Sequence, residues 1–338
     1  MNDKILLDHG SGGLATRQLI EDVFLEHLDN PVLSRMEDSA ILDLPQGKVA
    51  FTTDSFVIDP IFFPGGDIGS LSVHGTVNDL AMQGAKPRYL SLGLIIEEGL
   101  ELETLKRVAA SIGQAAKVAG VLIAAADTKV VGKGQADKIF INTSGIGVVP
   151  ERIDLGIQRA RPGDVVIVSG SIGDHGAAIL LARSGLPFHA EIKSDSAPLA
   201  DLVHQALSAV EPDAIRLFRD ATRGGVATVL NEIALASGVE IEIDEGEIPV
   251  DPDVGMVCEL LGLDPLYLAN EGKCVAVVSP EGASRVLEAM RGTSVGRAAR
   301  IIGEVKEAKG GPRVKLVTRV GGSRIVPILS GEPLPRIC

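Results

Sequence analysis

Cysteine is scarce in this 338-residue sequence, which contains three and no Cys-x-x-Cys pair. An odd number of cysteines without such a pair argues against a disulfide framework and against a structural zinc site. Cys258 and Cys274 lie in apolar surroundings, where we expect buried, unreactive thiols. Cys338 differs from both, because it is the last residue of the sequence.

Long apolar runs and basic segments are also absent. No stretch is long enough to span a bilayer, and no basic segment followed by an apolar one opens the chain, so we expect a cytoplasmic protein without membrane contact. The formal net charge is −13 with no basic stripe to offset it, which argues against nucleic acid as a partner. With 45% hydrophobic and 23% charged residues, the chain has a globular composition and the length of two domains.

The signatures of several common enzyme classes are missing as well. The glycine-rich loops at residues 9–13 and 170–176 can present backbone N–H groups to phosphate, but neither matches a P-loop or a dinucleotide-binding pattern. Taken alone, each equally indicates a tight turn into a helix. No Gly-x-Ser-x-Gly elbow is present and the six histidines never approach metal-ligand spacing, which argues against serine and zinc hydrolases.

What is present is an alternation of strand and helix patterns, which predicts an α/β (α+β) protein. The clearest helix covers residues 102–119, where apolar side chains recur at helical spacing and Gly120 marks the end. Asp67 predicts the N-cap of a helix that runs toward Gly84. The other expected helices are 177–184, 226–237 and 280–290, and the expected strands are 48–53, 121–125, 139–149, 165–168, 239–243, 274–278, 300–305 and 314–317.

A break at residues 150–162 separates two α/β halves. We therefore predict a first domain over residues 1–155, a second over 156–329, and a flexible Cys-terminated tail over 330–338. In the tail, Pro333 and Pro335 exclude a helix and favour an extended arm. Chain ends are mobile unless tied down and an accessible thiolate is a nucleophile, so such a tail can carry a group between sites. A stray exposed thiol is the simpler interpretation of Cys338 alone.

Acidic residues end apolar stretches or lie in glycine-rich loops at five separate places, at Asp38, Asp54, Asp79, Asp127 and Asp220. Any one such aspartate is more often a helix cap or a turn residue. If they converged, with few lysines nearby, they would repel one another unless a divalent cation were present. Mg²⁺ accepts oxygen ligands of this kind and usually binds beside substrate phosphates.

Taken together, these segments resemble the HypE family of hydrogenase maturation factors. The matching motifs, in chain order, are HGSGG at 9–13, EDSA at 37–40, TTDS at 52–55, VNDLAMQG at 77–84, DTKV at 127–130, DATRGG at 220–225, NEGK at 270–273 and PRIC at 335–338. The middle motifs alone indicate only the wider superfamily of aminoimidazole ribonucleotide synthetase and selenophosphate synthetase. The Cys-terminated tail narrows the resemblance to one family.

The resemblance implies a two-domain fold like that of aminoimidazole ribonucleotide synthetase, with the N-terminal domain pairing across a homodimer and ATP bound beside that interface. It also implies an enzyme that uses ATP and Mg²⁺ to dehydrate a carbamoyl group on Cys338 to a thiocyanate. In this family a carbamoyltransferase, HypF, loads the thiol, and the cyanide passes to iron on the HypC and HypD proteins during [NiFe]-hydrogenase maturation. Phosphorylation of the amide oxygen replaces loss of water by loss of phosphate.

The resemblance also assigns roles residue by residue. The implied metal ligands are Asp38, Asp79 and Asp220, the implied nucleotide-site residues are Asp54, Asn78, Asp127, Thr222 and Gly224, and the implied catalytic residues are Cys338, Lys129 and Glu271. Lys129 and Glu271 match the acid–base residues that would take protons from the amide nitrogen. For each of these two, a surface ion pair is the alternative interpretation.

One position departs from the family pattern. Ala126 precedes the Asp-Thr-Lys motif, where the family usually has glycine, and alanine would be strained there if the position required a positive φ.

Two other functions stay open. A small-molecule kinase of the same superfamily would leave Cys338 without a role, and a non-enzymatic nucleotide-binding adaptor would leave Lys129 and Glu271 without one.

Overall fold

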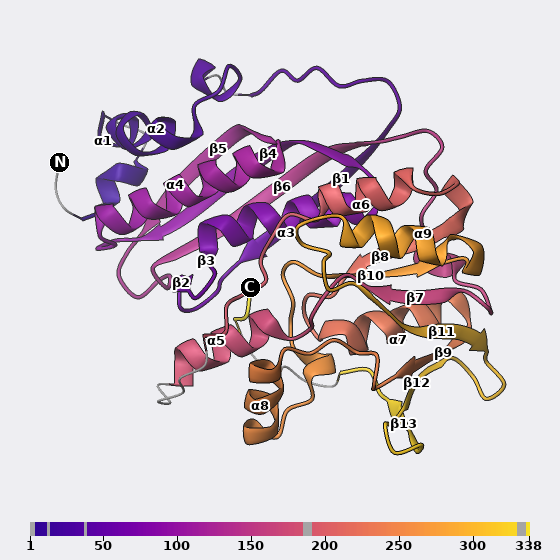
Figure 1. The fold of residues 1–338 in the computed structure, drawn as a ribbon. Helices are drawn as coiled ribbons and strands as arrows, with labels where there is room; N and C mark the ends of the chain where they lie inside the picture. Colours follow the sequence, from indigo (N-terminus) through magenta and orange to yellow (C-terminus); the bar gives the residue numbers. More distant parts are fainter. Residues whose placement is uncertain (1–3, 12–13, 37–38, 185–190, 330–335) are drawn as a thin grey trace.

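The computed structural model describes residues 4–11, 14–36, 39–184, 191–329 and 336–338. Its strands form two main sheets, one in each half of the chain (Figure 1). The first lies within residues 48–149 and the second within residues 165–326. The domain boundary that we propose after residue 155 falls between the two sheets.

The N-terminal half is built on a four-stranded sheet in the order β1-β6-β4-β5. β4 and β5 are parallel, and the other neighbours are antiparallel. Parallel neighbours require a crossover connection, and here α4 supplies it. The elements of this half are β1 (Lys48–Phe56), β2 (Phe62–Phe63), β3 (Gly66–Asp67), β4 (Lys86–Glu97), β5 (Leu122–Val131), β6 (Ile139–Val149), α1 (Leu14–Leu19), a π-helical turn (Ile20–Phe24), α2 (Leu25–Leu28), α3 (Ile68–Met82), α4 (Leu102–Ala119) and 3₁₀ turns at Leu7–Gly10 and Leu33–Arg35.

Local sequence signals begin and end the two long helices of this half. The Oδ1 atom of Asp67 accepts hydrogen bonds from the N–H groups of Gly69 and Ser70 at 2.7 and 3.0 Å, so Asp67 caps α3 as predicted. Gly120 adopts a left-handed conformation with φ of 69° directly after α4. The predicted helix over residues 102–119 is confirmed to the residue.

The N-terminal sheet has a face covered by α3 and α4 and an open face, since side chains alternate along each strand. On β4, Leu94 and Ile96 are buried, whereas Ile95 between them is 44% exposed. Phe51 of β1 lies on the same open face and is 68% exposed. Large apolar side chains therefore face outward from this sheet.

The C-terminal half contains a seven-stranded sheet in the order β13-β12-β9-β11-β7-β10-β8, antiparallel except between β12 and β9. α7 packs on β9 and β12, and α9 packs on β7 and β10. The elements are β7 (Val165–Val168), β8 (Ile215–Asp220), β9 (Val239–Asp244), β10 (Cys274–Val278), β11 (Arg300–Glu307), β12 (Arg313–Val317), β13 (Ser323–Val326), α5 (Asp174–Ser184), α6 (Ala200–Ser208), α7 (Gly225–Ser237), α8 (Pro252–Leu261), α9 (Pro280–Arg291) and 3₁₀ turns at Ile157–Arg159, Pro212–Ala214 and Pro265–Tyr267.

α3 joins the two halves. It packs on the N-terminal sheet along β1 and β6, and it also contacts α6 and β8 of the other half. Val77 of α3 and Leu202 of α6 are both fully buried in one continuous hydrophobic cluster. The two sheets therefore hold opposite sides of one buried helix.

The structure extends or adds several elements relative to the sequence-based expectation. β4, β8, β13, α6 and α8 were not expected, and β5 continues through Asp127 and Lys129 to Val131. The apolar pattern of β5 stops at Ala126, but backbone pairing with β4 carries the strand onward. Ala126 is thus extended and is not among the described residues with positive φ, so alanine is tolerated there.

The remaining expectations from composition concern the surface and two thiols. Cys258 and Cys274 are buried, as expected, and burial raises their pKa values to about 11 and 12.

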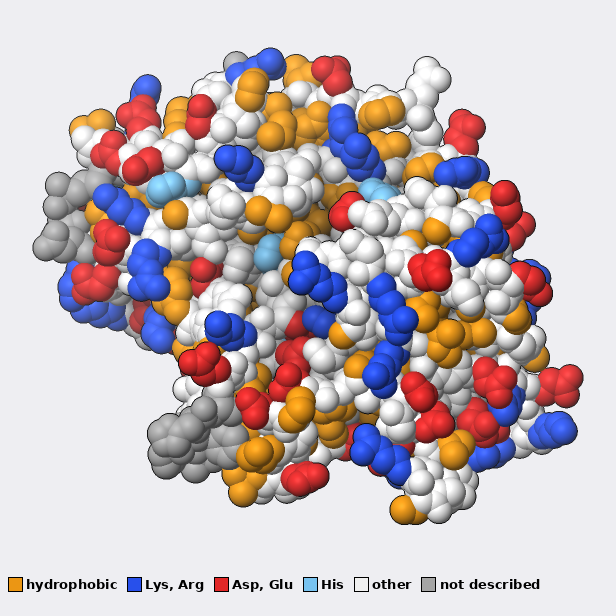
Figure 2. All heavy atoms as spheres, viewed as in Figure 1, with side chains coloured by type: hydrophobic (Ala, Val, Ile, Leu, Met, Phe, Trp, Pro, Cys, Tyr) orange, Lys and Arg blue, Asp and Glu red, His pale blue; other side chains and the backbone are white. Residues whose placement is uncertain are grey.

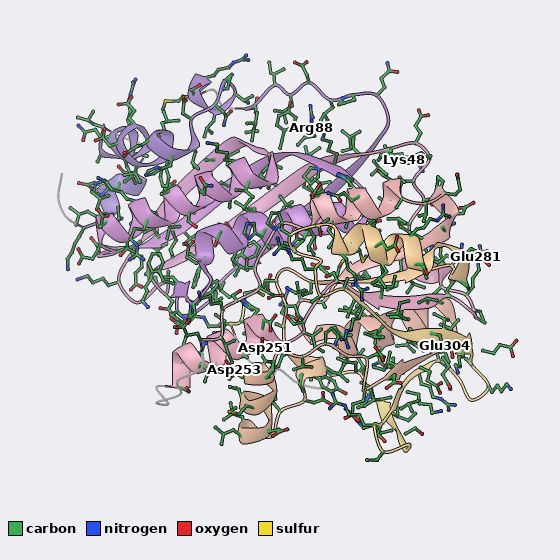
Figure 3. All side chains as sticks on the ribbon, viewed as in Figure 1. Lys48, Arg88, Asp251, Asp253, Glu281 and Glu304 are labelled. Atoms are coloured by element: carbon green, nitrogen blue, oxygen red, sulfur yellow. The ribbon has the colours of Figure 1, made fainter. Side chains whose placement is uncertain are left out.

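Acidic and basic side chains are interspersed over the face drawn in Figure 2. In Figure 3, Lys48 lies at the edge of the N-terminal half, and Glu281 and Glu304 lie at the edge of the other. Within the described part of the chain, no helix is long and apolar enough to cross a membrane.

Candidate functional site

Three of the predicted aspartates gather around the shared helix α3. Asp79 belongs to α3, Asp54 to β1 and Asp220 to the end of β8. Thr52 Oγ1 donates a hydrogen bond to Asp79 Oδ2 at 2.7 Å, and Thr76 Oγ1 donates one to Asp54 Oδ2 at 3.4 Å. Segments that are far apart in the sequence thus bring their carboxylates to one place.

The mutual repulsion expected for converging carboxylates is present. Burial, followed by the charge of Asp79, raises the pKa of Asp54 to about 6. The same two causes, in the same order, raise the pKa of Asp220 to about 7. Arg223 offsets only part of this negative charge at Asp54. The site therefore carries an excess of negative charge in a partly dehydrated space.

Glu271 lies at the inner end of this group, in the loop before β10. Its side chain is 3% exposed, and its Oε1 atom has no hydrogen-bond partner among the described residues. Burial is the first cause that raises its pKa well above the ordinary value, followed by the charges of Asp195, Asp220 and Asp54, while Arg223 opposes the shift. A buried, unpartnered carboxyl group of this kind can exchange a proton with a ligand.

The donor set fits Mg²⁺ in its chemistry. Asp79 and Asp220 supply hard carboxylate oxygens, which this cation prefers, and a divalent cation would relieve the repulsion that raises the pKa values. Asp38, the third predicted ligand, lies outside the described residues. Among the residues that the structure describes, no three His, Cys, Asp or Glu side chains form a ready-made metal cluster.

Thr222 and Gly224 lie between Asp220 and α7. Gly224 adopts φ of 76°, and a Cβ atom there would lie 2.2 Å from Thr228 Oγ1, so only glycine fits. The Thr222 carbonyl accepts a hydrogen bond from the N–H of Gly225 at 3.0 Å and closes the turn. This turn places backbone N–H groups at the start of α7, beside Asp220.

Asp127 and Lys129 lie apart from these carboxylates, on the open face of the N-terminal sheet. Their neighbours in the register of β4 are Gly93 and Ile95, whereas Asp54 faces α3 on the covered side. Lys129 Nζ pairs with Asp127 Oδ1 at 3.2 Å, with both side chains more than half exposed. The carboxylate beside Lys129 is therefore Asp127, and the described structure does not bring Lys129 to Glu271.

A cavity of about 710 Å³ adjoins Asp127 and Lys129. Gly10 and Ser39, from two of the recognised motifs, also line it. A Cβ atom on Gly10 would lie 2.5 Å from the Val130 nitrogen, so the backbone at Gly10 lies directly on β5. Asp127, a predicted nucleotide-site residue, therefore borders a cavity that also contacts the glycine-rich loop.

Asn78 occupies the seam between the two halves rather than an open pocket. Its Nδ2 group donates to the carbonyls of Ala197 and Glu271 at 3.0 and 3.2 Å, and its Oδ1 atom accepts from the Leu199 N–H at 2.7 Å. Its side chain is buried and engaged on both amide atoms. The assignment of Asn78 to the nucleotide site stays a prediction.

Residues 336–338, the described part of the predicted flexible tail, are docked on the rest of the chain, and residues 330–335 of that tail lie outside the described residues. The N–H of Val57 donates to the Cys338 carbonyl at 3.0 Å, and His175 Nε2 pairs with the Ile337 carbonyl at 2.8 Å. Arg336 also pairs with Asp137. Ile337 is 4% exposed and belongs to the core, because it fills space where the halves meet.

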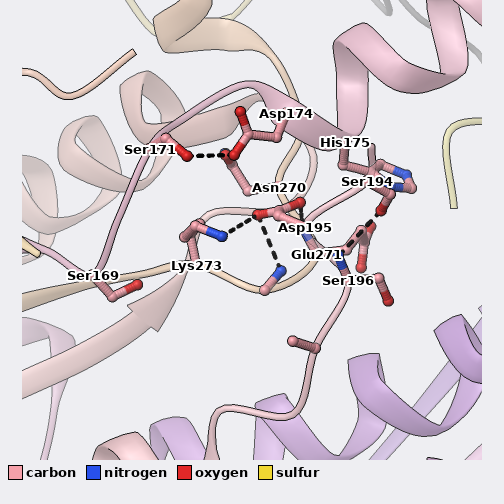
Figure 4. Close-up of polar contacts among 12 residues, drawn as sticks. Ser169, Ser171, Asp174, His175, Ser194, Asp195, Ser196, Asn270, Glu271 and Lys273 are labelled. Atoms are coloured by element: carbon pink, nitrogen blue, oxygen red, sulfur yellow. Dashed lines mark hydrogen bonds and ion pairs between the residues drawn. The ribbon is translucent and has the colours of Figure 1, made fainter. Parts of the chain in front are cut away.

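Sequence reasoning missed the polar residues that surround Glu271 and the docked end. They are His175, Ser194, Asp195 and Lys273, which form one connected group in Figure 4. Lys273 was part of a recognised motif but received no role. The segment around Asp195 carries no repeating pattern or recognised motif, so only its position in space identifies it.

Comparisons with known proteins agree with the resemblance. Residues 36–149 match the family model "AIR synthase related protein, N-terminal domain", and residues 161–315 match "AIR synthase related protein, C-terminal domain". A relative from Rhizobium leguminosarum bv. viciae named "Carbamoyl dehydratase HypE" is 53% identical over 337 residues, which cover 100% of this chain and 96% of that protein.

Two solved structures are similar over nearly their whole length. One is a hydrogenase maturation protein HypE in complex with ATP, with a TM-score of 0.94, 50% identity, and coverage of 98% of this chain and 99% of that one. The other is a HypE chain from a HypE–HypF complex, with a TM-score of 0.81, 51% identity, and coverage of 92% and 99%.

The buried state of Glu271 predicts a stability cost at neutral pH. Because its pKa is raised, the folded chain keeps a proton on Glu271 at pH values where the unfolded chain has released it. The free energy of unfolding is therefore highest below about pH 4.5, the ordinary pKa of this group, and falls as the pH rises above it. We expect Glu271→Gln to unfold at higher urea concentration than wild type at pH 8, with the difference vanishing near pH 4.5. Each unit of pKa elevation corresponds to about 1.4 kcal/mol.

The matched control for this prediction is Glu281→Gln, which removes an exposed carboxylate at the start of α9. It should leave the midpoint unchanged at both pH values. A stabilisation by Glu271→Gln that is the same at pH 4.5 and pH 8 would show that ionisation of this carboxyl is not the cause.

Proposed function

Because this chain belongs to the AIR synthase related family and, within it, to the HypE carbamoyl dehydratases, we propose that it converts a carbamoyl group on its own Cys338 to a thiocyanate, with ATP. The observation that carries the proposal is the docked chain end. Cys338 is held by Val57 and its neighbour Ile337 by His175, at the seam that also contains Glu271. A thiol that reaches this seam presents its cargo to a buried base.

The proposed reaction balances without a further reagent. The carbamoyl oxygen of Cys338–S–C(O)NH₂ takes the γ-phosphoryl group of ATP and then leaves as phosphate, while both nitrogen protons are lost and a C≡N bond forms. Glu271, in its ionised form, is the candidate base for the nitrogen protons, because its carboxyl group is buried and unpartnered and a cation at the neighbouring aspartates would oppose the rise of its pKa. Mg²⁺, held by Asp79 and Asp220 together with Asp38, would neutralise the transferring phosphoryl group.

ATP is proposed to bind beside an interface between two copies of the chain. The open face of the N-terminal sheet carries exposed Phe51 and Ile95, and the same face carries Asp127 and Lys129. A second copy packed against this face would bury the apolar side chains. It would also explain why Lys129 lies apart from Glu271 in one chain, since residues on an interface can serve a site shared by two copies.

The proposed partners follow from the reaction. A carbamoyltransferase of the HypF kind would load Cys338, as the solved complex of a relative with HypF suggests for this chain, and an iron-carrying HypC–HypD complex would receive the cyanide. A cytoplasmic location stays a prediction. The small-molecule kinase alternative gives no role to the docked Cys338, and the adaptor alternative gives none to the unpartnered carboxyl of Glu271.

The direct test is the mass of the C-terminal peptide after incubation with the carbamoyltransferase and then with ATP. We expect a carbamoyl adduct on Cys338 followed by loss of water in the wild-type protein. Cys338→Ala should fold and bind ATP as wild type does but form no adduct, because the side-chain sulfur makes only part of the terminal contacts. A wild-type chain that never acquires the adduct, or that keeps it unchanged with ATP, would contradict the proposed reaction.

Asp79→Asn tests the proposed metal site. We expect affinity for Mg²⁺-ATP to fall about tenfold or more, because one charged ligand is lost, and dehydration to be suppressed while carbamoyl loading continues. Asp253→Asn, at a partly exposed position at the start of α8, is the matched control. Calorimetry and peptide mass spectrometry provide the measurements, and unchanged dehydration in Asp79→Asn would remove this residue from the site.

Phe51→Asp tests the proposed interface. A charge in place of an exposed aromatic side chain should weaken self-association by about thirtyfold or more, corresponding to roughly 2 kcal/mol. Sedimentation velocity over a concentration series measures the effect. Val320→Asp places the same charge at a 94% exposed position in the other half and should leave association unchanged. Equal association of both variants and wild type would argue against this face.

A further inference from the structure

Residues 194–196, here called the strap, cross the seam between the two halves (Figure 4). The Ser194 N–H donates to the Pro64 carbonyl at 2.8 Å, and Ser196 Oγ pairs with Nδ1 of His74, on α3, at 3.0 Å. Both contacts join the strap to the N-terminal half. The strap therefore has a fixed position relative to α3 and the carboxylates around it.

The middle residue of the strap holds the backbone of the loop that carries Glu271. Asp195 Oδ1 accepts from the Glu271 N–H at 3.0 Å, and Asp195 Oδ2 accepts from the Gly272 N–H at 3.3 Å and from Lys273 Nζ at 3.2 Å. The Asp195 and Lys273 side chains are 2% and 10% exposed. A Cβ atom on Gly272 would lie 1.9 Å from the Asp195 carbonyl oxygen, so the loop and the strap are in direct contact.

The first residue of the strap holds the docked chain end through His175. Ser194 Oγ lies 2.7 Å from His175 Nδ1 and accepts a hydrogen bond from the Ser196 N–H at 3.1 Å. The Ser194 hydroxyl proton is thus directed to Nδ1, which leaves the imidazole proton on Nε2, where it donates to the Ile337 carbonyl at 2.8 Å. Burial lowers the pKa of His175, in agreement with this neutral tautomer.

We propose that the strap positions the two reacting parts of the site relative to each other, with Asp195 placing Glu271 and Ser194 placing the Cys338 end of the chain through His175. The inference rests on the proposed function, in which Glu271 acts on a group carried by Cys338. The Asp195 link ends on the backbone N–H of Glu271, and the Ser194–His175 link ends on the backbone carbonyl of Ile337. Both links therefore fix the position of a reacting group without contacting its reacting atoms. Misplacement by about 1 Å costs on the order of a hundredfold in rate.

Two variants separate the links. Ser194→Ala removes the hydroxyl that selects the His175 tautomer, and Asp195→Asn removes the charge and one of the oxygens that hold residues 271–273. We expect both to lower the single-turnover rate of water loss from the carbamoylated chain by about ten- to a hundredfold, with carbamoyl loading and ATP affinity within about twofold of wild type. A merely structural role would lower ATP affinity and rate together.

A second readout does not depend on the reaction. With the docked end loosened, Cys338 should react with iodoacetamide about three- to tenfold faster in Ser194→Ala than in wild type, while buried Cys258 and Cys274 stay unlabelled. In Asp195→Asn the labelling rate of Cys338 should change less, since this residue holds the other group. Long-range ¹H–¹⁵N spectra should show the His175 tautomer of wild type lost in Ser194→Ala.

Ser237→Ala is the matched control. The Ser237 hydroxyl also accepts from one backbone N–H and makes one further hydrogen bond, to the Ile157 carbonyl at 2.7 Å, but it lies in the C-terminal half away from the strap. It should match wild type in rate, labelling and ATP affinity. Should Asp195→Asn fail to fold because Lys273 is left unpaired, the double variant Asp195→Asn/Lys273→Met carries the same test.

Wild-type rates of water loss and of Cys338 labelling in both strap variants would overturn the inference. A fall in rate that is accompanied by an equal loss of ATP affinity would overturn it as well. If the wild-type chain itself does not dehydrate its adduct, the proposed function fails. The labelling rates and tautomer still decide whether Ser194 holds the chain end.

Discussion

Negative charge confined to the seam between the two halves is the constraint on which the rest of this structure depends. Asp54, Asp79, Asp220 and Glu271 converge there from four segments, and the pKa values of three of them are raised. Arg223 opposes the shifts at Asp54 and Glu271, and Arg219 opposes the shift at Asp220. Such a group destabilises the folded chain on its own. Rigid elements must therefore hold this group of carboxylates in place. The central element is α3, which packs against both sheets.

The two buried carboxyl groups beside each other at this seam have opposite surroundings. Asp195 accepts three hydrogen bonds, one of them from its ion-pair partner Lys273, which makes it a fixed structural group. Glu271 lies within the same loop contact, yet its Oε1 atom has no partner among the described residues. The surroundings thus distinguish two chemically similar side chains, as they do in many acid–base sites. Both carboxylate oxygens of Asp195 accept hydrogen bonds, whereas the Oε1 atom of Glu271 can still contact a ligand.

Geometry also divides the recognised motifs between two faces of one sheet. Asp54 points toward α3, and Asp127 and Lys129 point to the open face, although all three belong to strands of the same sheet. The alternation of side chains along strands makes this separation unavoidable. A site that uses both sets needs either a long ligand that passes around the sheet edge or a second copy of the chain. The exposed Phe51 and Ile95 favour the second arrangement.

Elements with strong local signals were predictable from the sequence. The helix over residues 102–119 follows from apolar spacing and Gly120, and the Asp67 cap follows from its side chain. The strands at 139–149, 165–168 and 274–278 were also found to the residue, since each is a compact β-rich segment. By contrast, β4 is stabilised by pairing with β6 and β5, and the continuation of β5 through Asp127 is stabilised by pairing with β4, which no local pattern records.

For the site, the sequence by itself determined which residues are the candidates for the chemistry, because motifs such as residues 77–84 and 270–273 specify carboxylates and glycines in a fixed order. Only the tertiary structure decided where these residues lie relative to one another. It docked the final three residues of the chain, it placed Lys129 and Glu271 apart, and it brought Ser194 and Asp195 to the seam. The physical reason is that hydrogen bonds and burial between distant segments depend on packing, to which a local sequence pattern is blind.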